Sequence, residues 1–275
     1  MRPHVCSDTD MYNTVNPADD ANGYATRILA EGDSWFSMGN LAAANLLEQQ
    51  DFDQSTIIVN CAYSGDTVRR MVTYMVNQRF YDALQYRDWS GIFLSGGGND
   101  LIDAINGADG TKRILKAAAN PMSLNADDWI DAADLKALVD YVRVNLAHMI
   151  SWRSGVNAAI PVLLNTYDYA MPRPEGLLVA GPWLQPRLKE LNAPLGVWGP
   201  VARRLISALA DAIGQLHDPA GGVYVVRTPG TLTPAGVDTK GVSGDWANEI
   251  HPAKGGYTKL CAVWKQARQG WGLGF

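Results

Sequence analysis

The sequence predicts an open α/β fold, in which a parallel β-sheet carries helices on both of its faces. Short apolar runs rich in Ile, Val and Leu recur along the chain, bounded by Gly, Asp or Pro, which is typical of buried parallel strands. Stretches with helical periodicity lie between these runs, and this alternation favours a parallel sheet with flanking helices. The predicted strands are residues 27–31, 56–60, 91–95, 160–165 and 223–227.

The helical stretches have their apolar residues on one face. In the stretch of residues 132–150, Asp131 and Asp134 precede the apolar periodicity and Gly155 follows it, as helix capping suggests. We therefore expect these helices between and after the strands: residues 41–49, 67–80, 132–150, 201–215 and 255–269.

Three segments do not follow the alternation. Residues 1–24 are polar and rich in Asp and Asn, and are expected to form a loosely attached N-terminal arm on a single domain of residues 25–275. Two insertions interrupt that domain, at about residues 106–128 and 167–199. The second insertion carries five prolines and several apolar residues. A loop of this length in a compact domain is usually functional, so we expect a lid or a pocket wall.

Composition narrows the class of protein. A chain of 275 residues with 47% apolar and 19% charged residues is expected to be globular, and it is long enough to bury a sizeable core. The net charge of −5 argues against binding nucleic acid, which favours a basic surface. No uncharged apolar run has the length of a membrane span, and the N-terminal residues do not resemble a secretory signal, so a cytoplasmic location is expected.

The cysteines do not predict a cofactor. Cys6, Cys61 and Cys261 lie far apart and have no paired spacing, which argues against a disulfide framework and against a zinc site. We expect neither a metal nor an organic cofactor. The sequence leaves the oligomeric state open.

Small and polar residues follow the first three predicted strands. Because ligands bind at the carboxyl ends of the strands in an open α/β sheet, these three segments are expected to meet at one site. They are Gly32-Asp33-Ser34, Ser64-Gly65-Asp66 and Gly96-Gly97-Gly98-Asn99-Asp100.

The residue types at these strand ends suit acyl transfer. A serine on a turn between a strand and a helix presents its hydroxyl as a nucleophile, provided that a base activates it. Attack on a carbonyl creates an oxyanion, which needs preorganised hydrogen-bond donors. The backbone N–H groups of Ser34 and Gly65 and the side-chain amide of Asn99 are the candidates.

In these residues the chain resembles the SGNH, or GDSL, family of serine hydrolases. Ser34 in Gly-Asp-Ser, Gly65, Asn99 in Gly-Gly-Asn-Asp and His251 in Asn-Glu-Ile-His-Pro match the four family blocks in order. The resemblance implies a three-layer α/β/α fold, flavodoxin-like, with a five-stranded parallel sheet. It also implies an esterase that cleaves a small-molecule ester through an acyl-enzyme on Ser34, without a cofactor.

Within the resemblance, His251 is the general base for Ser34. The family has an aspartate three residues before this histidine, and here that position is Asn248. Three alternatives stay open for the group that orients the imidazole. It is Asn248 itself, a carboxylate from Glu249 or Asp245, or a backbone carbonyl.

The other polar residues near the strand ends have structural interpretations. Asp33 and Asp100 are expected to cap helices or to bind turn amides, because a carboxylate beside an oxyanion would oppose catalysis. Asp168 follows the fourth strand and is a candidate for lining the pocket. Trp35 and Phe36 belong either to the core or to an acyl-pocket wall.

A rival hypothesis is a non-catalytic member of the same fold that binds a small molecule or a carbohydrate. The uncharged Asn248 favours it, because the imidazolium formed during catalysis would have no carboxylate partner. A phosphate-binding role for residues 96–98 is disfavoured, since no Walker lysine follows the glycines.

Overall fold

A parallel sheet forms the centre of the computed structural model, which describes residues 1–7, 23–37, 44–86, 88–107, 113–177 and 180–275. Within these residues the sheet has six strands in the order β1-β3-β2-β4-β5-β6. The strands are β1 (His4–Ser7), β2 (Thr26–Gly32), β3 (Thr56–Asn60), β4 (Gly91–Ser95), β5 (Val162–Asn165) and β6 (Val223–Val226). All five predicted strands are confirmed, and the side chains of β3, β4 and β5 are buried almost throughout.

The sixth strand corrects the predicted five-stranded sheet. β1 lies within the expected N-terminal arm and pairs in parallel with β3, from His4 opposite Ile57 to Ser7 opposite Asn60. The Met1 ammonium group donates to the Asp51 carboxylate at 2.7 Å, which fixes the start of the chain. A four-residue edge strand between polar residues has too few apolar positions to show a pattern. Residues 8–22 of the expected arm lie outside the described residues.

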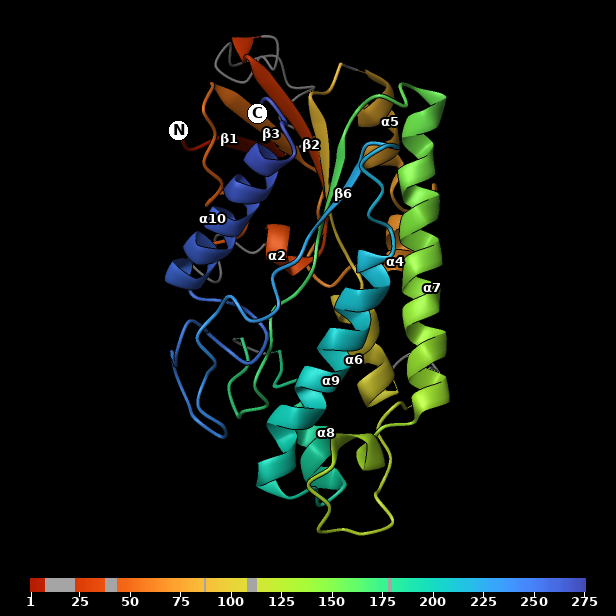
Figure 1. The fold of residues 1–275 in the computed structure, drawn as a ribbon, viewed down its shortest axis with the longest axis vertical. Helices are drawn as coiled ribbons and strands as arrows, with labels where there is room; N and C mark the ends of the chain where they lie inside the picture. The colour runs from red at the N-terminus through yellow and green to blue at the C-terminus, as the bar shows by residue number, and fades with distance from the viewer. Residues whose placement is uncertain (8–22, 38–43, 87, 108–112, 178–179) are drawn as a thin grey trace.

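Helices cover both faces of the sheet, as expected. Figure 1 shows α10 on one side of the strands and α5 and α7 on the other side. The described α-helices are α2 (Ser34–Ser37), α4 (Val68–Met71), α5 (Gln78–Tyr86), α6 (Gly98–Asn106), α7 (Ala132–Ser151), α8 (Gln185–Glu190), α9 (Leu195–Gly214) and α10 (Lys254–Gly270). Two short 3₁₀ segments, Ala126–Trp129 and Trp152–Gly155, flank α7.

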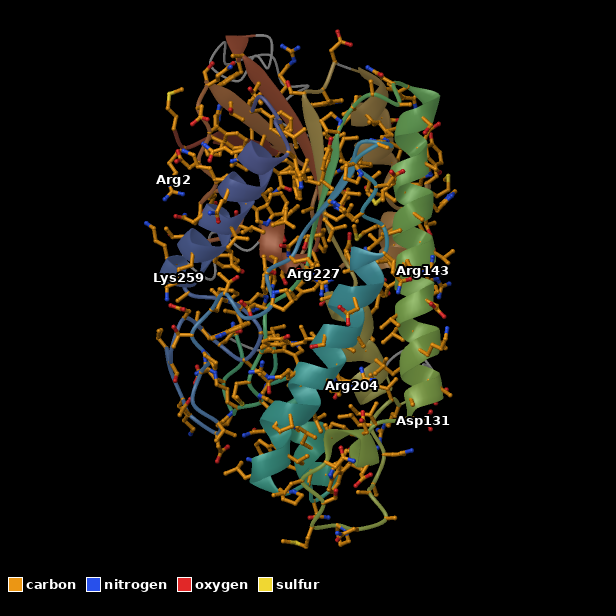
Figure 2. The ribbon with its side chains drawn as sticks, in the orientation of Figure 1. Arg2, Asp131, Arg143, Arg204, Arg227 and Lys259 are labelled. Carbon is orange, nitrogen blue, oxygen red and sulfur yellow. The ribbon has the colours of Figure 1, made fainter. Side chains whose placement is uncertain are left out.

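The predicted helices 132–150, 201–215 and 255–269 correspond to α7, α9 and α10. The Asp131 carboxylate accepts the N–H groups of Ala133 and Asp134, both at 3.1 Å, which confirms the predicted cap. Figure 2 shows Asp131 at the end of α7. None of the described helices combines the length and the apolar composition that crossing a bilayer requires.

Two helix predictions were wrong. The segment 67–80 divides into α4 and the start of α5, because the Asn77 amide donates to the Met71 carbonyl at 2.7 Å and ends α4. The described part of 41–49 forms turns instead of a helix. There the Asn45 side chain accepts the N–H of Glu48 at 2.8 Å, and the Leu46 N–H donates to the Trp35 carbonyl at 2.9 Å.

Candidate active site

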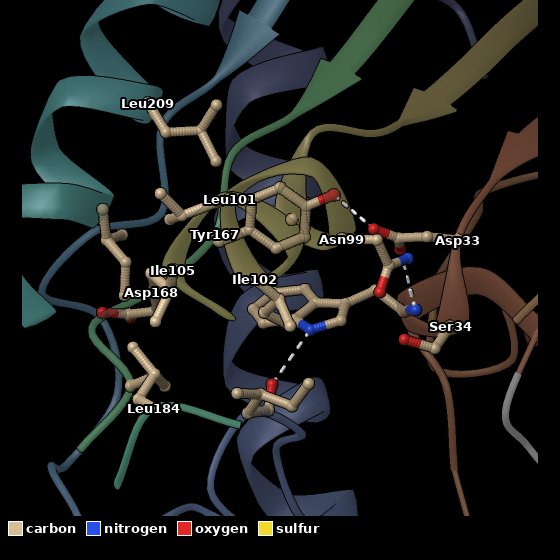
Figure 3. Close-up of a pocket in the computed structure, with 15 residues that line it drawn as sticks. Asp33, Ser34, Asn99, Leu101, Ile102, Ile105, Tyr167, Asp168, Leu184 and Leu209 are labelled. Carbon is tan, nitrogen blue, oxygen red and sulfur yellow. Dashed lines mark hydrogen bonds between the residues drawn. The ribbon is translucent and has the colours of Figure 1, made fainter. Parts of the chain in front are cut away.

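The sheet brings the predicted site residues together at the carboxyl ends of its strands. Ser34 is the first residue of α2, directly after β2, and Asn99 is the second residue of α6, after β4. Gly65 lies in the turn that follows β3, and His251 lies in the loop before α10. Figure 3 shows Ser34 and Asn99 at the same end of one pocket. The convergence expected from the sequence is therefore present in the structure.

A chain of hydrogen bonds joins Ser34, His251 and Asn248. The Ser34 Oγ lies 2.8 Å from the His251 Nε2, and the His251 Nδ1 lies 3.1 Å from the Asn248 Oδ1. The three side chains come from two segments of the chain, since Asn248 lies three positions before His251 and 217 positions separate Ser34 from His251. The spacing is that of a nucleophile, a base and an orienting group.

The orientation of the Asn248 amide is fixed by the backbone. Its Oδ1 also accepts the N–H groups of Ile250 at 3.0 Å and of His251 at 2.8 Å. A side-chain oxygen that accepts two backbone N–H groups cannot be exchanged with the amide nitrogen. The Oδ1 therefore faces the imidazole, and the His251 Nδ1 must carry the proton that it donates. The Nε2 is then free of a proton and accepts the Ser34 hydroxyl.

The His251 ring is almost completely buried. His251 and Asn248 are each 2% exposed, and the Ser34 residue is 8% exposed. Burial lowers the pKa of His251 from 6.5 to about 4, because the imidazolium loses its hydration. The Trp183 ring lies edge-on to the imidazole with a centroid distance of 5.7 Å and adds apolar surface. His251 is thus neutral at ordinary pH.

The two carboxylates considered as orienting groups are engaged elsewhere. Glu249 accepts four backbone N–H groups from the 167–199 insertion, those of Arg173, Trp183, Leu184 and Gln185. Asp245 accepts the Thr233 N–H at 2.6 Å and pairs with Lys259 at 2.6 Å. The structure gives neither carboxylate a hydrogen bond to the described His251 ring. Asn248 is the side chain that the structure places on Nδ1.

Glycine conformations shape the candidate oxyanion site. Gly65 has φ of +89°, a backbone conformation that is strained for any residue with a side chain. A Cβ atom placed on Gly65 would have no atom beyond its chain neighbours within 4 Å. Gly97 has φ of +103°, and a Cβ there would lie 2.7 Å from Val142. The turn at Gly97 starts α6 and presents Asn99, whose amide donates to the Asp66 carbonyl at 2.9 Å. An amide carries two N–H donors, so one N–H of Asn99 is left for a ligand.

Asp33 is a structural carboxylate, as predicted. Its Oδ1 accepts the Trp35 N–H at 3.0 Å, and its Oδ2 accepts the Tyr167 hydroxyl at 2.5 Å. Burial raises the pKa of Asp33, and the hydrogen bond from the Tyr167 hydroxyl lowers it by a smaller amount. The resulting pKa is about 6. Tyr167 was not among the site residues predicted from the sequence, although its position after β5, next to Asp168, could have indicated it.

Asp100 holds the turn before α4 against the start of α6. Its Oδ2 accepts the Val68 N–H at 2.9 Å, which confirms a role in binding turn amides. Burial raises the pKa of Asp100 to about 7. Asp168 likewise accepts backbone N–H groups, from Tyr169 at 2.6 Å, Gly230 at 2.7 Å and Leu232 at 2.8 Å.

A narrow apolar pocket of about 50 Å³ opens beside Ser34. Figure 3 shows it running from Ser34 past Tyr167 and Ile102 toward Leu184 and Asp168. The Trp35 indole N–H donates to the Ile250 carbonyl at 3.1 Å and ties this wall to the His251 loop. Trp35 is therefore a pocket wall, whereas Phe36 is fully buried in the core. The lining residues are Asp33, Ser34, Trp35, Gly98, Asn99, Leu101, Ile102, Ile105, Tyr167, Asp168, Ala170, Leu184, Ile206, Leu209 and Ile250.

The 167–199 insertion supplies part of this pocket. Tyr167, Asp168, Ala170 and Leu184 line it, in agreement with the predicted pocket wall. The Glu249 carboxylate holds both ends of the stretch from Arg173 to Gln185. Residues 178–179 of the insertion lie outside the described residues. Among the described side chains, no group of three or more His, Cys, Asp or Glu residues is arranged to hold a metal ion.

Comparison with solved structures shows that lipases share the fold of this chain. No family model matches the sequence, and no curated protein matches it. Among solved structures, the lipase Lip_vut3 from a goat rumen metagenome matches with a TM-score of 0.56 and 15% identity, covering 88% of this chain and 97% of the lipase. Phospholipase A1 from Streptomyces albidoflavus matches with a TM-score of 0.50 and 15% identity, covering 88% and 99%.

The fold is that of the SGNH hydrolases. The SGNH fold of this chain differs from the expected five-stranded form by the edge strand β1. At this level of identity the solved structures establish the architecture, and the chemistry of this chain is argued from its own residues.

Proposed function

We propose that this protein is a serine ester hydrolase that acts through an acyl-enzyme on Ser34, with His251 as the general base. The observation that carries the proposal is the 2.8 Å contact between the Ser34 Oγ and the His251 Nε2. Because the His251 Nδ1–H donates to the Asn248 Oδ1, the Nε2 is left as the acceptor. The SGNH fold, shared with lipases, supports ester hydrolysis as the reaction class.

The chemistry follows from this geometry. The His251 Nε2 takes the hydroxyl proton as the Ser34 Oγ bonds to the ester carbonyl carbon, and the carbonyl oxygen becomes an oxyanion. The backbone N–H groups of Ser34 and Gly65 and the free N–H of Asn99 would stabilise that charge. His251 then returns the proton to the leaving alcohol as the C–O bond breaks. A water molecule, deprotonated by His251, attacks the acyl-enzyme and releases the acid and Ser34.

Asn248 would act as the orienting group without a charge. In serine proteases, replacing the orienting aspartate by asparagine lowers turnover about 10⁴-fold, because the imidazole adopts the wrong tautomer. Here the backbone N–H groups of Ile250 and His251 hold the Asn248 oxygen toward the ring, which selects the productive tautomer. The main cost of asparagine in the proteases is therefore absent from this arrangement. What is missing is the charge that would stabilise the imidazolium.

Hydrolysis of a small activated ester tests the proposal. We expect p-nitrophenyl acetate to be hydrolysed by the native protein, and both Ser34→Ala and His251→Gln to reduce turnover by at least about 10³-fold. Asp245→Asn is the matched control, because Asp245 is bonded to Thr233 and Lys259 and has no bond to His251. Equal turnover by Ser34→Ala and the native protein would overturn the proposal.

The second candidate is a non-catalytic binding protein of the same fold. The uncharged Asn248 and the low pKa of His251 favour it, because both make the imidazolium unfavourable. The two candidates differ in a simple respect. A binding protein would take up an ester in the pocket beside Ser34 and release it unchanged, whereas the hydrolase would release an acid and an alcohol.

A further inference from the structure

Two cavities of opposite character lie at the candidate active site, one lined by Ser34 and the other by Gly65. One is the apolar pocket of about 50 Å³, and the other is an open polar depression of about 590 Å³, which we call the polar basin. The polar basin is lined by Tyr63, Ser64, Gly65, Asp66, Thr67, Arg69, Arg70 and Asp103. The polar basin is the larger of the two cavities and has charged or hydroxyl-bearing side chains on most of its wall.

The two cavities lie on either side of the candidate oxyanion site, because Ser34 and Asn99 line the pocket and Gly65 lines the polar basin. The Tyr63 N–H donates to the Gly32 carbonyl at 3.0 Å, directly before the Ser34 turn. The hydroxyls of Ser64 and Ser37 lie 2.8 Å apart, which joins the wall of the polar basin to α2. Helix α6 separates the two spaces, since Ile102 lines the pocket and Asp103 lines the polar basin.

This arrangement assigns the two halves of an ester. A carbonyl seated between Ser34 and the Gly65 N–H has its acyl chain on one side and its alcohol on the other. A cavity needs about 10–15 Å³ to hold one water-sized group, so a pocket of about 50 Å³ has room for roughly four such groups. The acyl chain of a short acid suits this small apolar space. The alcohol must then occupy the polar basin.

The side chains of the polar basin indicate what kind of alcohol it takes. The positive charges of its two guanidinium groups equal the negative charges of its two carboxylates in number, and Arg70 forms a salt bridge with Asp66 at 2.7 Å. Such a wall offers donors and acceptors without a net charge, which suits several hydroxyl groups better than an anionic or cationic headgroup. Tyr63 is 67% exposed, so its ring is available to pack against the C–H face of a sugar.

We propose that the substrate is a short-chain acyl ester of a neutral polyhydroxylated alcohol, a carbohydrate in chemical class. Its acyl chain enters the pocket past Ile102, and its sugar lies in the polar basin against Tyr63. This inference rests on the proposed ester hydrolysis at Ser34 and adds which ester is cleaved.

Matched esters test the alcohol assignment. The probes are the butanoate of the primary hydroxyl of methyl glucoside, ethyl butanoate, and the butanoates of choline and of glycerol phosphate. We expect the sugar ester to exceed the other three in kcat/KM by about tenfold or more. Tyr63→Ala should lower the ratio of sugar ester to ethyl ester about fivefold, whereas Tyr74→Ala, an exposed tyrosine packed on Tyr81, should leave that ratio as it is.

Acyl chain length tests the other half. On the sugar ester the native protein should prefer butanoate to octanoate, and Ile102→Ala should move the preference toward the longer chain. Ile102→Phe should move it toward acetate. Val144→Phe, on the exposed face of α7, is the control for added bulk. An Ile102 effect on alcohol preference instead of chain length would overturn the assignment, as would a preference for the choline or glycerol phosphate ester.

The failure of this inference is distinguishable from that of the proposed function. Labelling of Ser34 by a small fluorophosphonate needs neither cavity to be filled by substrate. A labelled Ser34 together with an unselective or reversed ester profile rejects the carbohydrate ester alone. An unlabelled Ser34 without hydrolysis of any of the esters rejects both.

Discussion

The side-chain oxygen of Asn248 lies 3.1 Å from Nδ1 of His251, at the place where the SGNH pattern has an aspartate. The same oxygen accepts two backbone N–H groups of its own loop. In the proposed mechanism an uncharged group would therefore perform the orienting half of the aspartate's role. The buried Asn248 Nδ2 has no hydrogen-bond partner among the described residues, so the loop tolerates an unsatisfied donor to keep this side chain in place.

Substitutions of Asn248 separate orientation from charge. Asn248→Asp keeps an oxygen toward Nδ1 and adds a charge that stabilises the imidazolium, so ester turnover should be preserved or raised. Asn248→Leu removes the acceptor and should lower kcat by about 10²–10⁴-fold. Steady-state hydrolysis of p-nitrophenyl acetate measures both. A large loss in Asn248→Asp together with no loss in Asn248→Leu would exclude Asn248 as the orienting group.

The pH profile should extend far into acid. His251 must be neutral to accept the Ser34 proton, and its lowered pKa of about 4 keeps it neutral above that pH. The acid limb of kcat/KM should therefore fall near pH 4, below the value of about 6.5 expected for an unperturbed histidine. Asn248→Asp should move this limb to higher pH, because a carboxylate favours the imidazolium. An acid limb at or above about pH 6.5 in the native protein would contradict the burial argument.

The sheet and the catalytic blocks were predictable for a physical reason. The strands β2 to β6 are buried on both faces, so each is a compact apolar run that stands out in the sequence. Because the strands are parallel, residues at their carboxyl ends lie at the same edge of the sheet, independently of how the helices pack. β1 was missed because an edge strand of four residues needs little apolar surface. The break between α4 and α5 depends on the Asn77 side chain, which periodicity does not weigh.

The role of Glu249 could not be predicted from spacing. Its four N–H partners lie 64 to 76 positions earlier in the chain, in a loop whose path is set by tertiary packing. Seen in the sequence alone, a carboxylate two residues before His251 is a reasonable orienting group. In the structure it anchors the pocket wall, and the shorter Asn248 reaches the imidazole.

Glu249→Gln should loosen that wall. The substitution replaces an oxygen that accepts backbone N–H groups by an NH₂ group that faces them, and the loss should be about 2–4 kcal/mol in the free energy of unfolding. The stability is measured by urea unfolding, with Glu175→Gln as the control. The Glu175 side chain accepts one N–H, from Gly241 at 2.7 Å, so Glu175→Gln should lower the free energy of unfolding much less. Equal stabilities of the two variants would show that the four bonds do not anchor the segment.

Asp100 predicts a pH-dependent stability. Its folded pKa of about 7 lies above the ordinary 3.8, so the folded state holds the proton more tightly than the unfolded state. The stability that Asp100 contributes is thus present at low pH and is lost as pH rises toward 7. Asp100→Asn keeps an acceptor for the Val68 N–H without a charge.

At pH above about 7 the free energy of unfolding of Asp100→Asn should exceed that of the native protein by about 3 kcal/mol. This difference in stability should shrink toward about pH 4. Urea unfolding at both pH values measures this. A variant that is less stable than the native protein at high pH would contradict the raised pKa.

Covalent labelling is the decisive test of whether Ser34 is a nucleophile activated by His251. The protein is treated with a fluorophosphonate between about pH 6 and 9, and the modified peptide is identified by mass spectrometry. The account predicts one phosphonate on Ser34, with labelling abolished in Ser34→Ala and slowed by at least about 10²-fold in His251→Gln. An unmodified Ser34 throughout that range would contradict it.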